Sequence, residues 1–155
     1  MTGYKVVNLK IMTEELGEDR VKSILSKFSC PLNEDVELFL RAKAIEFSKQ
    51  GIAQTHLVYA SYKGEPILTG YFALANKYIT VKADVVKGKL RQKIRRFATR
   101  DENIKAYCLS APLIAQLGKN YLDGANKLIT GAELLEIACQ KISAIQFDLG
   151  GKFVY

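Results

Sequence analysis

Apolar residues recur at spacings of three and four positions in the first third of the chain, which is the period of an amphipathic helix. The pattern predicts one helix from Glu18 to Phe28, which Pro31 helps to end because the residue before a proline disfavours the helical conformation. A second helix is predicted to begin after Asn33, whose side chain can accept hydrogen bonds from first-turn N–H groups, and to end at Gly51. Two consecutive helices are therefore expected near the N-terminus.

Alternating apolar and polar positions, rich in β-branched and aromatic residues, predict strands. The first is expected at Tyr4–Met12. Thr55–Tyr62 and Ile67–Leu74 flank a short turn that contains glycine and proline, which predicts an antiparallel hairpin. Tyr78–Lys82 either continues the second hairpin strand or forms a short strand of its own.

The last third of the chain is predicted to hold a strand, a long helix and the beginning of a final strand. The strand covers Ala106–Leu117 and is expected to be interrupted by Pro112, which lacks a backbone donor. The long helix covers residues 128–145, where apolar residues line one face. The final strand is expected at Lys152–Tyr155.

The predicted order is β-α-α-β-β-(α)-β-α-β, where the bracketed element is a short basic helix near residue 94, and it indicates one α/β (α+β) domain over residues 1–155. A chain of 155 residues can bury a sizeable core. The tight hairpin excludes a purely parallel sheet, so a mixed, mostly antiparallel sheet flanked by helices is expected. Strand 106–117 should lie beside the hairpin, and strand 152–155 should run parallel to it because a helix crosses between them.

The segment from Leu113 to Leu135 combines a strand, a loop with small residues and the start of a long helix. Such a junction directs free N–H groups and the positive end of the helix dipole at one place, which favours anion binding. The same residues also fit an ordinary helix start, with Thr130 as N-cap and Glu133 completing a capping box. From these residues alone, the capping box is the favoured interpretation.

Over essentially the whole chain, the element order and the Ile114–Leu135 stretch resemble the GNAT superfamily of N-acetyltransferases, and that stretch resembles motif A of the family. The resemblance implies that acetyl-CoA is the cosubstrate and that strand backbone groups contact its pantetheine arm. The resemblance also implies that the pyrophosphate of acetyl-CoA binds at a loop of the form Gln/Arg-x-x-Gly-x-Gly/Ala. On this sequence the pantetheine-contacting residues would be Leu117, Gly118 and Lys119, and the pyrophosphate loop would be Asn126, Lys127, Leu128, Ile129, Thr130 and Gly131.

This chain departs from the family's loop at two positions. Asn126 stands where the family has Gln or Arg, and Ile129 stands where it has the first glycine. Gly131 agrees with the last glycine, and Gly124 is an alternative point of close backbone approach.

The resemblance implies direct attack of a primary amine on the acetyl thioester, helped by proton removal and by stabilisation of the developing oxyanion. As general base, Glu34, Glu37, Asp84 and Tyr71 are candidates, and none is favoured. The family's C-terminal helix and hairpin, with the tyrosine that commonly protonates the thiolate, have no counterpart before Tyr155. We therefore expect a C-terminally truncated domain that binds coenzyme weakly and turns over poorly, and a catalytically silent acyl-CoA-binding domain is an alternative.

The net charge of +7 comes from one region, because ten basic residues face three acidic ones between Lys77 and Lys105. Residues 87–96 form the densest part and carry Leu90, Ile94 and Phe97 on one face, which predicts a short surface helix. It resembles an insertion relative to GNAT domains. A solvated helix face is the favoured interpretation of this basic 87–100 region. Nucleic-acid contact is the alternative, including a tRNA-directed acetyltransferase.

Other candidate residues predict structural roles. The three cysteines, Cys30, Cys108 and Cys139, show no paired spacing, which favours free thiols and a cytoplasmic protein without a metal site. Cys108 has no recognisable histidine partner, and His56 is expected to be a packed or capped residue and not a catalytic base. No membrane contact is expected, and the expected partners are acyl-CoA, an unknown amine acceptor and, as a further option, a second copy in a homodimer. The hairpin aromatics Tyr59, Tyr62, Tyr71 and Phe72 are predicted to pack in the core and across strands.

Overall fold

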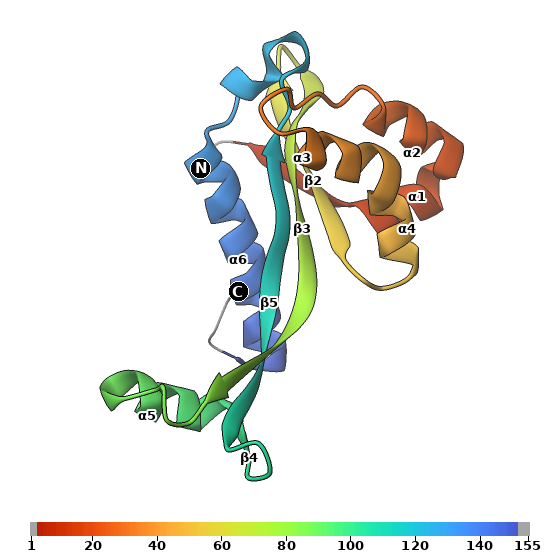
Figure 1. The fold of residues 1–155 in the computed structure, drawn as a ribbon. Helices are drawn as coiled ribbons and strands as arrows, with labels where there is room; N and C mark the ends of the chain where they lie inside the picture. Colours follow the sequence, from red (N-terminus) through yellow and green to blue (C-terminus); the bar gives the residue numbers. More distant parts are fainter. Residues whose placement is uncertain (1–2, 152–155) are drawn as a thin grey trace. The chain divides into compact units, whose positions relative to one another are not determined.

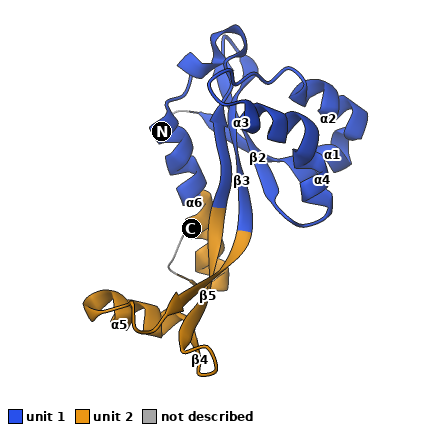
Figure 2. Ribbon diagram, viewed as in Figure 1, with its two compact units in different colours: residues 1–75, 114–140 blue, residues 76–113, 141–155 orange. Residues whose placement is uncertain are grey.

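The computed structural model describes residues 3–151 of the chain (Figure 1). The chain divides into two compact units, which we call unit 1 and unit 2 (Figure 2). Unit 1 consists of residues 1–75 and 114–140, and unit 2 consists of residues 76–113 and 141–155. Each unit is described by itself below.

One five-stranded sheet runs through the fold in the order β1-β2-β3-β5-β4. Its strands are β1 (Tyr4–Asn8), β2 (Gln54–Tyr62), β3 (Glu65–Lys82), β4 (Thr99–Asp101) and β5 (Ala106–Lys119). The predicted β2–β3 hairpin is confirmed, with Leu57 opposite Tyr71 and a register shift after Val58. β5 lies beside β3 as predicted, and residues 78–82 continue β3.

Every pairing between the described strands whose register is resolved is antiparallel. In unit 1, the Asn120 N–H donates to the Thr69 carbonyl, and in unit 2 the Ala83 N–H donates to the Lys105 carbonyl. β3 and β5 therefore also run in opposite directions. The strand expected at 152–155, and with it the expected parallel pairing, lies outside the described residues.

Six α-helices are present among residues 3–151. They are α1 (Leu9–Leu16), α2 (Glu18–Leu25), α3 (Glu34–Leu38), α4 (Ala44–Lys49), α5 (Gly88–Phe97) and α6 (Gly131–Leu149). A π-helical turn, Phe39–Lys43, joins α3 to α4, so the predicted second helix is continuous but wider at its centre. Asn33 caps it as predicted, because its side chain accepts from the Val36 N–H at 3.3 Å.

The strand predicted at Tyr4–Met12 is wrong beyond Asn8. The Asn8 side chain accepts hydrogen bonds from the N–H groups of Lys10 and Ile11, at 2.9 and 3.3 Å, and so begins α1. Leu9 and Met12, three residues apart, are both buried. The helix cap at Asn8 therefore determines the local structure, although apolar and polar positions still alternate for a few residues beyond it.

The interruption predicted at Pro112 is also wrong, because β5 continues through this residue. β4 pairs with β5 only at residues 106–108, so the edge of β5 at Pro112 has no partner among the described strands. The missing N–H of a proline removes no ladder hydrogen bond at an open edge. β4 itself was not predicted, since three residues give no periodic signal.

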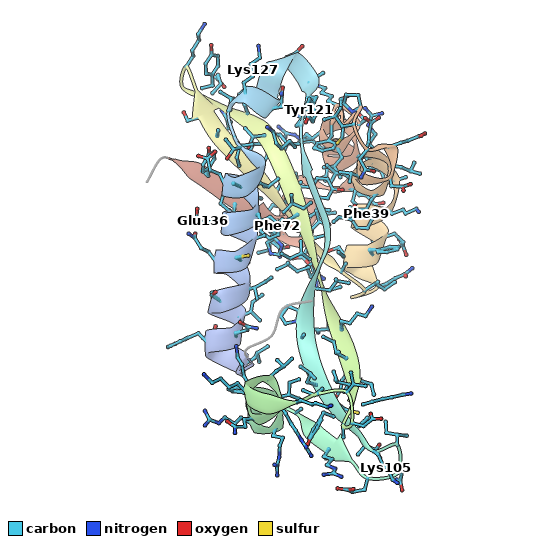
Figure 3. The ribbon with its side chains drawn as sticks, turned by 60° about the vertical axis from the view of Figure 1, so that its left-hand side comes forward. Phe39, Phe72, Lys105, Tyr121, Lys127 and Glu136 are labelled. Carbon is cyan, nitrogen blue, oxygen red and sulfur yellow. The ribbon has the colours of Figure 1, made fainter. Side chains whose placement is uncertain are left out.

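The sheet of unit 1 is covered on both faces. The helices of residues 9–49 bury one face, where Tyr71 meets Phe28 edge to face, with ring centroids 5.3 Å apart. On the other face Phe72 stacks on His56, and the first part of α6 approaches Gly70 through Leu134. Figure 3 shows Phe39 and Phe72 on opposite sides of the sheet.

Unit 2 has a smaller core. The cluster beneath α5 has four buried members, Val86, Ile94, Tyr107 and Leu109. Ile94 comes from α5, and the partly buried Ile79 and Val81 pack against the cluster from β3. The predicted surface helix is thus confirmed, and one apolar residue at its centre anchors it.

Candidate functional site

The connection from β5 to α6 is held by Asn120, the residue that follows the strand. Its Oδ1 accepts from the N–H groups of Ser29 at 3.0 Å and Leu122 at 3.1 Å, and its Nδ2 donates to the Leu68 carbonyl at 2.8 Å. The side chain is buried and joins β3, the segment after α2 and the start of the connection. A buried amide with all these groups satisfied fixes the path of the backbone on leaving the sheet.

The connection then forms a 3-10 turn, Leu122–Lys127, in which the backbone takes left-handed conformations at Asp123 and Gly124, with φ of 50° and 76°. The Leu128 N–H donates to the Ala125 carbonyl, and the Tyr4 hydroxyl donates to the Leu128 carbonyl at 2.9 Å. Burial is the main reason that the pKa of Tyr4 is raised. Tyr4 therefore ties the N-terminal strand to this connection.

The predicted capping box at the start of α6 is confirmed. The Thr130 hydroxyl accepts from the Glu133 N–H at 3.1 Å, and the Glu133 carboxylate accepts from the Thr130 N–H at 2.8 Å. Hydrogen bonds from Thr130 are the main cause that lowers the pKa of Glu133, and the Lys119 charge adds to it. A carboxylate thus already occupies part of the positive end of the helix.

A cavity of about 660 Å³ lies in unit 1 beside this connection. Its walls come from the end of α2, the β2–β3 turn and residues 120–128, and they include Tyr59, Leu68 and Asn120. Three exposed charged residues line the cavity, the cations Lys27 and Lys127 and the carboxylate Asp123. Figure 3 shows Tyr121 and Lys127 on the connection after β5.

The structure brings together some of the residues that the resemblance implied. Lys127 and Leu128 line the cavity, as does Gly124, whereas Leu117, Gly118 and Lys119 do not. The N–H groups expected to converge on a phosphate are partly engaged, since Leu128 and Thr130 donate within the protein.

Among the other predicted loop residues, Ile129 is buried and Gly131 is open, with no atom within 4 Å of a Cβ placed on it. Asn126 is half-buried. Gly118 is crowded, because such a Cβ would lie 2.2 Å from Cγ1 of Val36. The glycine at 118 is therefore required by packing.

Sequence reasoning missed Lys27, Tyr4 and Asn120. Lys27 sits at the end of an amphipathic helix, where a lysine is common, and Tyr4 contacts a residue 124 positions away. Asn120 directly follows a strand, which is the one available signal for a residue that orders the loop after it.

Two of the four candidate bases have structural roles. The Tyr71 hydroxyl donates to the Val36 carbonyl at 2.6 Å, and burial raises its pKa far above the usual range. The Glu37 carboxylate accepts from the Cys30 N–H at 2.7 Å and pairs with Arg41 at 2.9 Å. Glu34 is exposed at the start of α3, and Asp84 belongs to unit 2.

The remaining candidates lie largely where the sequence placed them. His56 is buried against Phe72, with ring centroids 5.0 Å apart. Tyr71 and Phe72 are core residues, but Tyr59 and Tyr62 line the cavity. Cys30, Cys108 and Cys139 are all free thiols.

Between residues 3 and 151, no helix is long and apolar enough to cross a bilayer. The same residues bring together no group of three or more His, Cys, Asp or Glu side chains that could hold a metal ion.

No protein-family model matches the chain, and no curated protein matches it. Several solved structures share its fold. AtaT in complex with acetyl-methionyl-tRNAfMet has a TM-score of 0.62 at 15% identity, over 96% of this chain and 74% of that one. A tyrosine-to-phenylalanine variant of KacT has a TM-score of 0.61 at 14% identity, over 98% and 74% of the two chains.

A corresponding variant of the toxin AtaT has a TM-score of 0.53 at 18% identity. That match covers 81% of this chain, which spans 62% of the length of that toxin. These neighbours are GNAT-fold proteins. The protein therefore has the GNAT fold.

Proposed function

We propose that the protein is an N-acetyltransferase that transfers an acetyl group from acetyl-CoA to a primary amine. The observation that carries the proposal is the shared fold, because AtaTR, one of the matching structures, is bound with acetyl-CoA. That match has a TM-score of 0.54 and covers 95% of this chain. The cavity beside the β5–α6 connection supplies a place for the coenzyme.

The chemistry of the cavity suits a phosphate-bearing ligand with an apolar arm. Lys27 and Lys127 can neutralise phosphate charge beside one acidic lining residue, Asp123, while Leu68 and neighbouring apolar side chains can cover the part of the arm nearest the phosphates. The capping box leaves the N–H groups of Gly131 and Ala132 as first-turn donors without an intrahelical acceptor. We place the pyrophosphate at residues 126–131 and the pantetheine arm along the backbone of Leu117–Lys119.

The proposed reaction balances with acetyl-CoA and the amine as its only two substrates. The amine nitrogen forms a bond to the acetyl carbonyl carbon, the carbon–sulfur bond breaks, and the proton lost by the amine balances the released thiolate. Coenzyme A thus supplies an activated acyl group. The protein's part is to bind and orient both substrates and to donate N–H groups to the developing oxyanion.

Calorimetric titration of the chain with acetyl-CoA tests the coenzyme site. Gly131→Val should weaken binding, because a branched side chain would block the approach to the helix start, and it should not disturb the fold since the position is open. Lys127→Ala should cost about 1 kcal/mol of binding free energy, as one screened charge is lost. Lys43→Ala, an exposed lysine elsewhere in unit 1, is the matched control.

Tight binding that survives Gly131→Val, in a variant that melts like the parent, would place the coenzyme elsewhere. A thiol-release assay with amine acceptors separates an enzyme from a catalytically silent acyl-CoA-binding domain. Coenzyme binding without thiol release for any amine would support the silent domain.

A second candidate concerns the acceptor. AtaT, which has the same fold, is seen with acetyl-methionyl-tRNAfMet. We therefore propose the α-amine of an aminoacyl-tRNA as an acceptor to be assayed beside free amines and peptides. Acetylation of free amines but of no charged tRNA would remove this candidate.

We further propose that residues 1–155 act as one domain in the cytoplasm, where the three free thiols would stay reduced. A homodimer is the proposed assembly, and light scattering at several concentrations would measure it. A monomer at all concentrations would exclude it.

A further inference from the structure

The charge of the molecule is divided unevenly between the two units. Unit 2 contains 12 basic and four acidic residues, whereas unit 1 contains 11 basic and 12 acidic residues. The excess in unit 2 centres on α5 and its flanks, since no acidic residue occurs between positions 85 and 100. Nothing in the proposed coenzyme site uses these cations.

The structure presents the cations of α5 to solvent on a helix that is fixed in place. Ile94 is 5% exposed and packs with Val86, Tyr107 and Leu109, so the helix is docked on the core of unit 2. All of its basic side chains are exposed, as are those next to it in the chain. We call these cations the α5 basic face, made of Lys87, Lys89, Arg91, Lys93, Arg95 and Arg96, of which Lys89, Lys93 and Arg96 share one side of the helix. Arg100, after the helix, pairs with Glu102 at 3.0 Å.

The basic side chains at the start of α5 are not placed to stabilise the helix, whereas Arg95 and Arg96 in its last turn are. Arg91 and Arg95 lie four positions apart, a spacing at which like charges repel. The N-terminus of α5 has no capping side chain and no acidic residue in its first turn, and Lys87 and Lys89 lie at this positive end. A sequence selected only for a solvated helix would place acidic residues there.

The guanidinium groups of this face act together on the core beneath it. Arg91, with further contributions from Arg95 and Arg100, lowers the pKa of the Tyr107 hydroxyl. Arg91 and Arg95 thus add positive charge on the side of α5 near Tyr107, while Arg100 pairs with Glu102.

From this arrangement we infer that the α5 basic face binds the phosphate backbone of a nucleic acid. A duplex carries about one negative charge for each 1.7 Å of its axis, so it offers several phosphates to the cations along one helix. An anionic membrane would use the exposed Leu90 and Phe97 beside these cations, and the vesicle arm of the test below separates this outcome. The inference rests on the second candidate function, an aminoacyl-tRNA as acceptor, and adds a binding surface to it. Its test uses no coenzyme, so nucleic-acid binding and acetyl transfer can fail separately.

Fluorescence anisotropy with labelled duplex RNA, duplex DNA and a single strand, titrated with the full chain at several salt concentrations, measures the binding. The logarithm of the association constant should fall with the logarithm of salt by about 0.9 for each phosphate contacted on a duplex. Reversal of Lys87, Lys89 and Arg96 to Glu should weaken binding more than about tenfold. The neutral pair Lys89→Gln and Arg96→Gln should lower the salt slope by about 0.9 for each phosphate that is no longer neutralised.

The matched control reverses three exposed lysines of unit 1, Lys5, Lys10 and Lys43, to Glu. It changes the net charge by the same amount and should retain most of the affinity. Circular dichroism confirms that each variant is folded, and the neutral pair keeps the test decisive if the triple reversal unfolds.

Salt-sensitive binding that is lost in the α5 variants and kept in the control supports the inference, and the three probes identify the type of nucleic acid. An equal loss in the control would show that only net charge matters and would overturn it. Absence of binding to all three probes at about 0.15 M salt, or equal affinity for poly-glutamate or phosphatidylserine vesicles, would also overturn it.

Discussion

The two units differ in how their helices begin and in what holds their cores. In unit 1, side chains cap three helices, through Asn8, Asn33 and Thr130. In unit 2, α5 has no capping side chain, and Ile94 anchors it on a cluster with Val86, Tyr107 and Leu109. In unit 1, capping side chains fix the helix starts around a cavity, whereas in unit 2 a small core holds a charged helix at the surface.

The largest effect is expected where unit 1 is most tightly packed. Gly118→Ala should destabilise the fold by about 3 kcal/mol, because its Cβ would lie 2.2 Å from Cγ1 of the buried Val36. In a Val36→Ala background the added cost should fall below about 1 kcal/mol, since the clashing methyl is gone. Urea unfolding of the parent, the two single variants and the double variant measures the cost of Gly118→Ala in both backgrounds.

Gly131→Ala is the control, because this glycine has open space around it and the change should alter stability by less than about 0.5 kcal/mol. A Gly118→Ala protein as stable as the parent would show that the β5–α3 contact is looser than described.

The second-largest loss of stability in unit 1 is expected on removal of the Asn120 side chain. Asn120→Ala should cost about 2.5 kcal/mol, because it leaves the buried N–H of Ser29 and the Leu68 carbonyl without their partner. Asn126→Ala, a half-buried residue in the same connection, should cost much less. Thermal melting measures the stability, and hydrogen exchange at residues 121–130 should report faster opening in Asn120→Ala alone.

Unit 2 should respond locally. Ile94→Ala should cost about 2 kcal/mol, at the low end for a buried isoleucine, because a small core can collapse around the vacancy. Hydrogen exchange should accelerate in residues 76–113 and remain unchanged in unit 1. Leu90→Ala, on the same helix but 56% exposed, is the control. Equal acceleration in both units would show that they open together and would remove the distinction between them.

The smallest effect concerns the capping box. Thr130→Ala should cost about 1 kcal/mol through the lost N-cap. Because the pKa of Glu133 is lower in the folded chain than its ordinary value of 4.5, its stabilising contribution is complete at neutral pH and is lost as the pH falls below 4.5. Glu133→Gln should remove this part of the acid dependence, which melting curves between neutral and acid pH would reveal. An unchanged acid dependence in Glu133→Gln would show that other carboxylates dominate it.

Much of the fold could be predicted from local patterns. The helix at Glu18, the Asn33 cap, the hairpin and the capping box all rest on signals within a few residues of each other, and all are confirmed. The end of the first strand at Asn8 could not be predicted, because a side-chain cap and a continuing alternation compete at the same residues. Pro112 was misjudged because its tolerance depends on β4 being too short to reach it.

The candidate site was less predictable, since its parts come together only in the folded chain. The resemblance pointed to Lys127, Leu128 and Gly124, which do line the cavity. Lys27 and Tyr4 have no signal of their own, because each reaches the site from a distant element. The placement of coenzyme at residues 117–119 and 126–131 stays a prediction.

The Glu133 carboxylate at the start of α6 acts as a tethered competitor for any anion that approaches there. A tethered group has a high effective concentration, so a phosphate must displace it or bind beside it against like-charge repulsion. Coenzyme affinity at this helix would then rise on acidification, as Glu133 takes up a proton, and would rise in Glu133→Gln at neutral pH, where the parent carboxylate is charged. The same hydrogen bonds that stabilise the helix would thus set the affinity of the site.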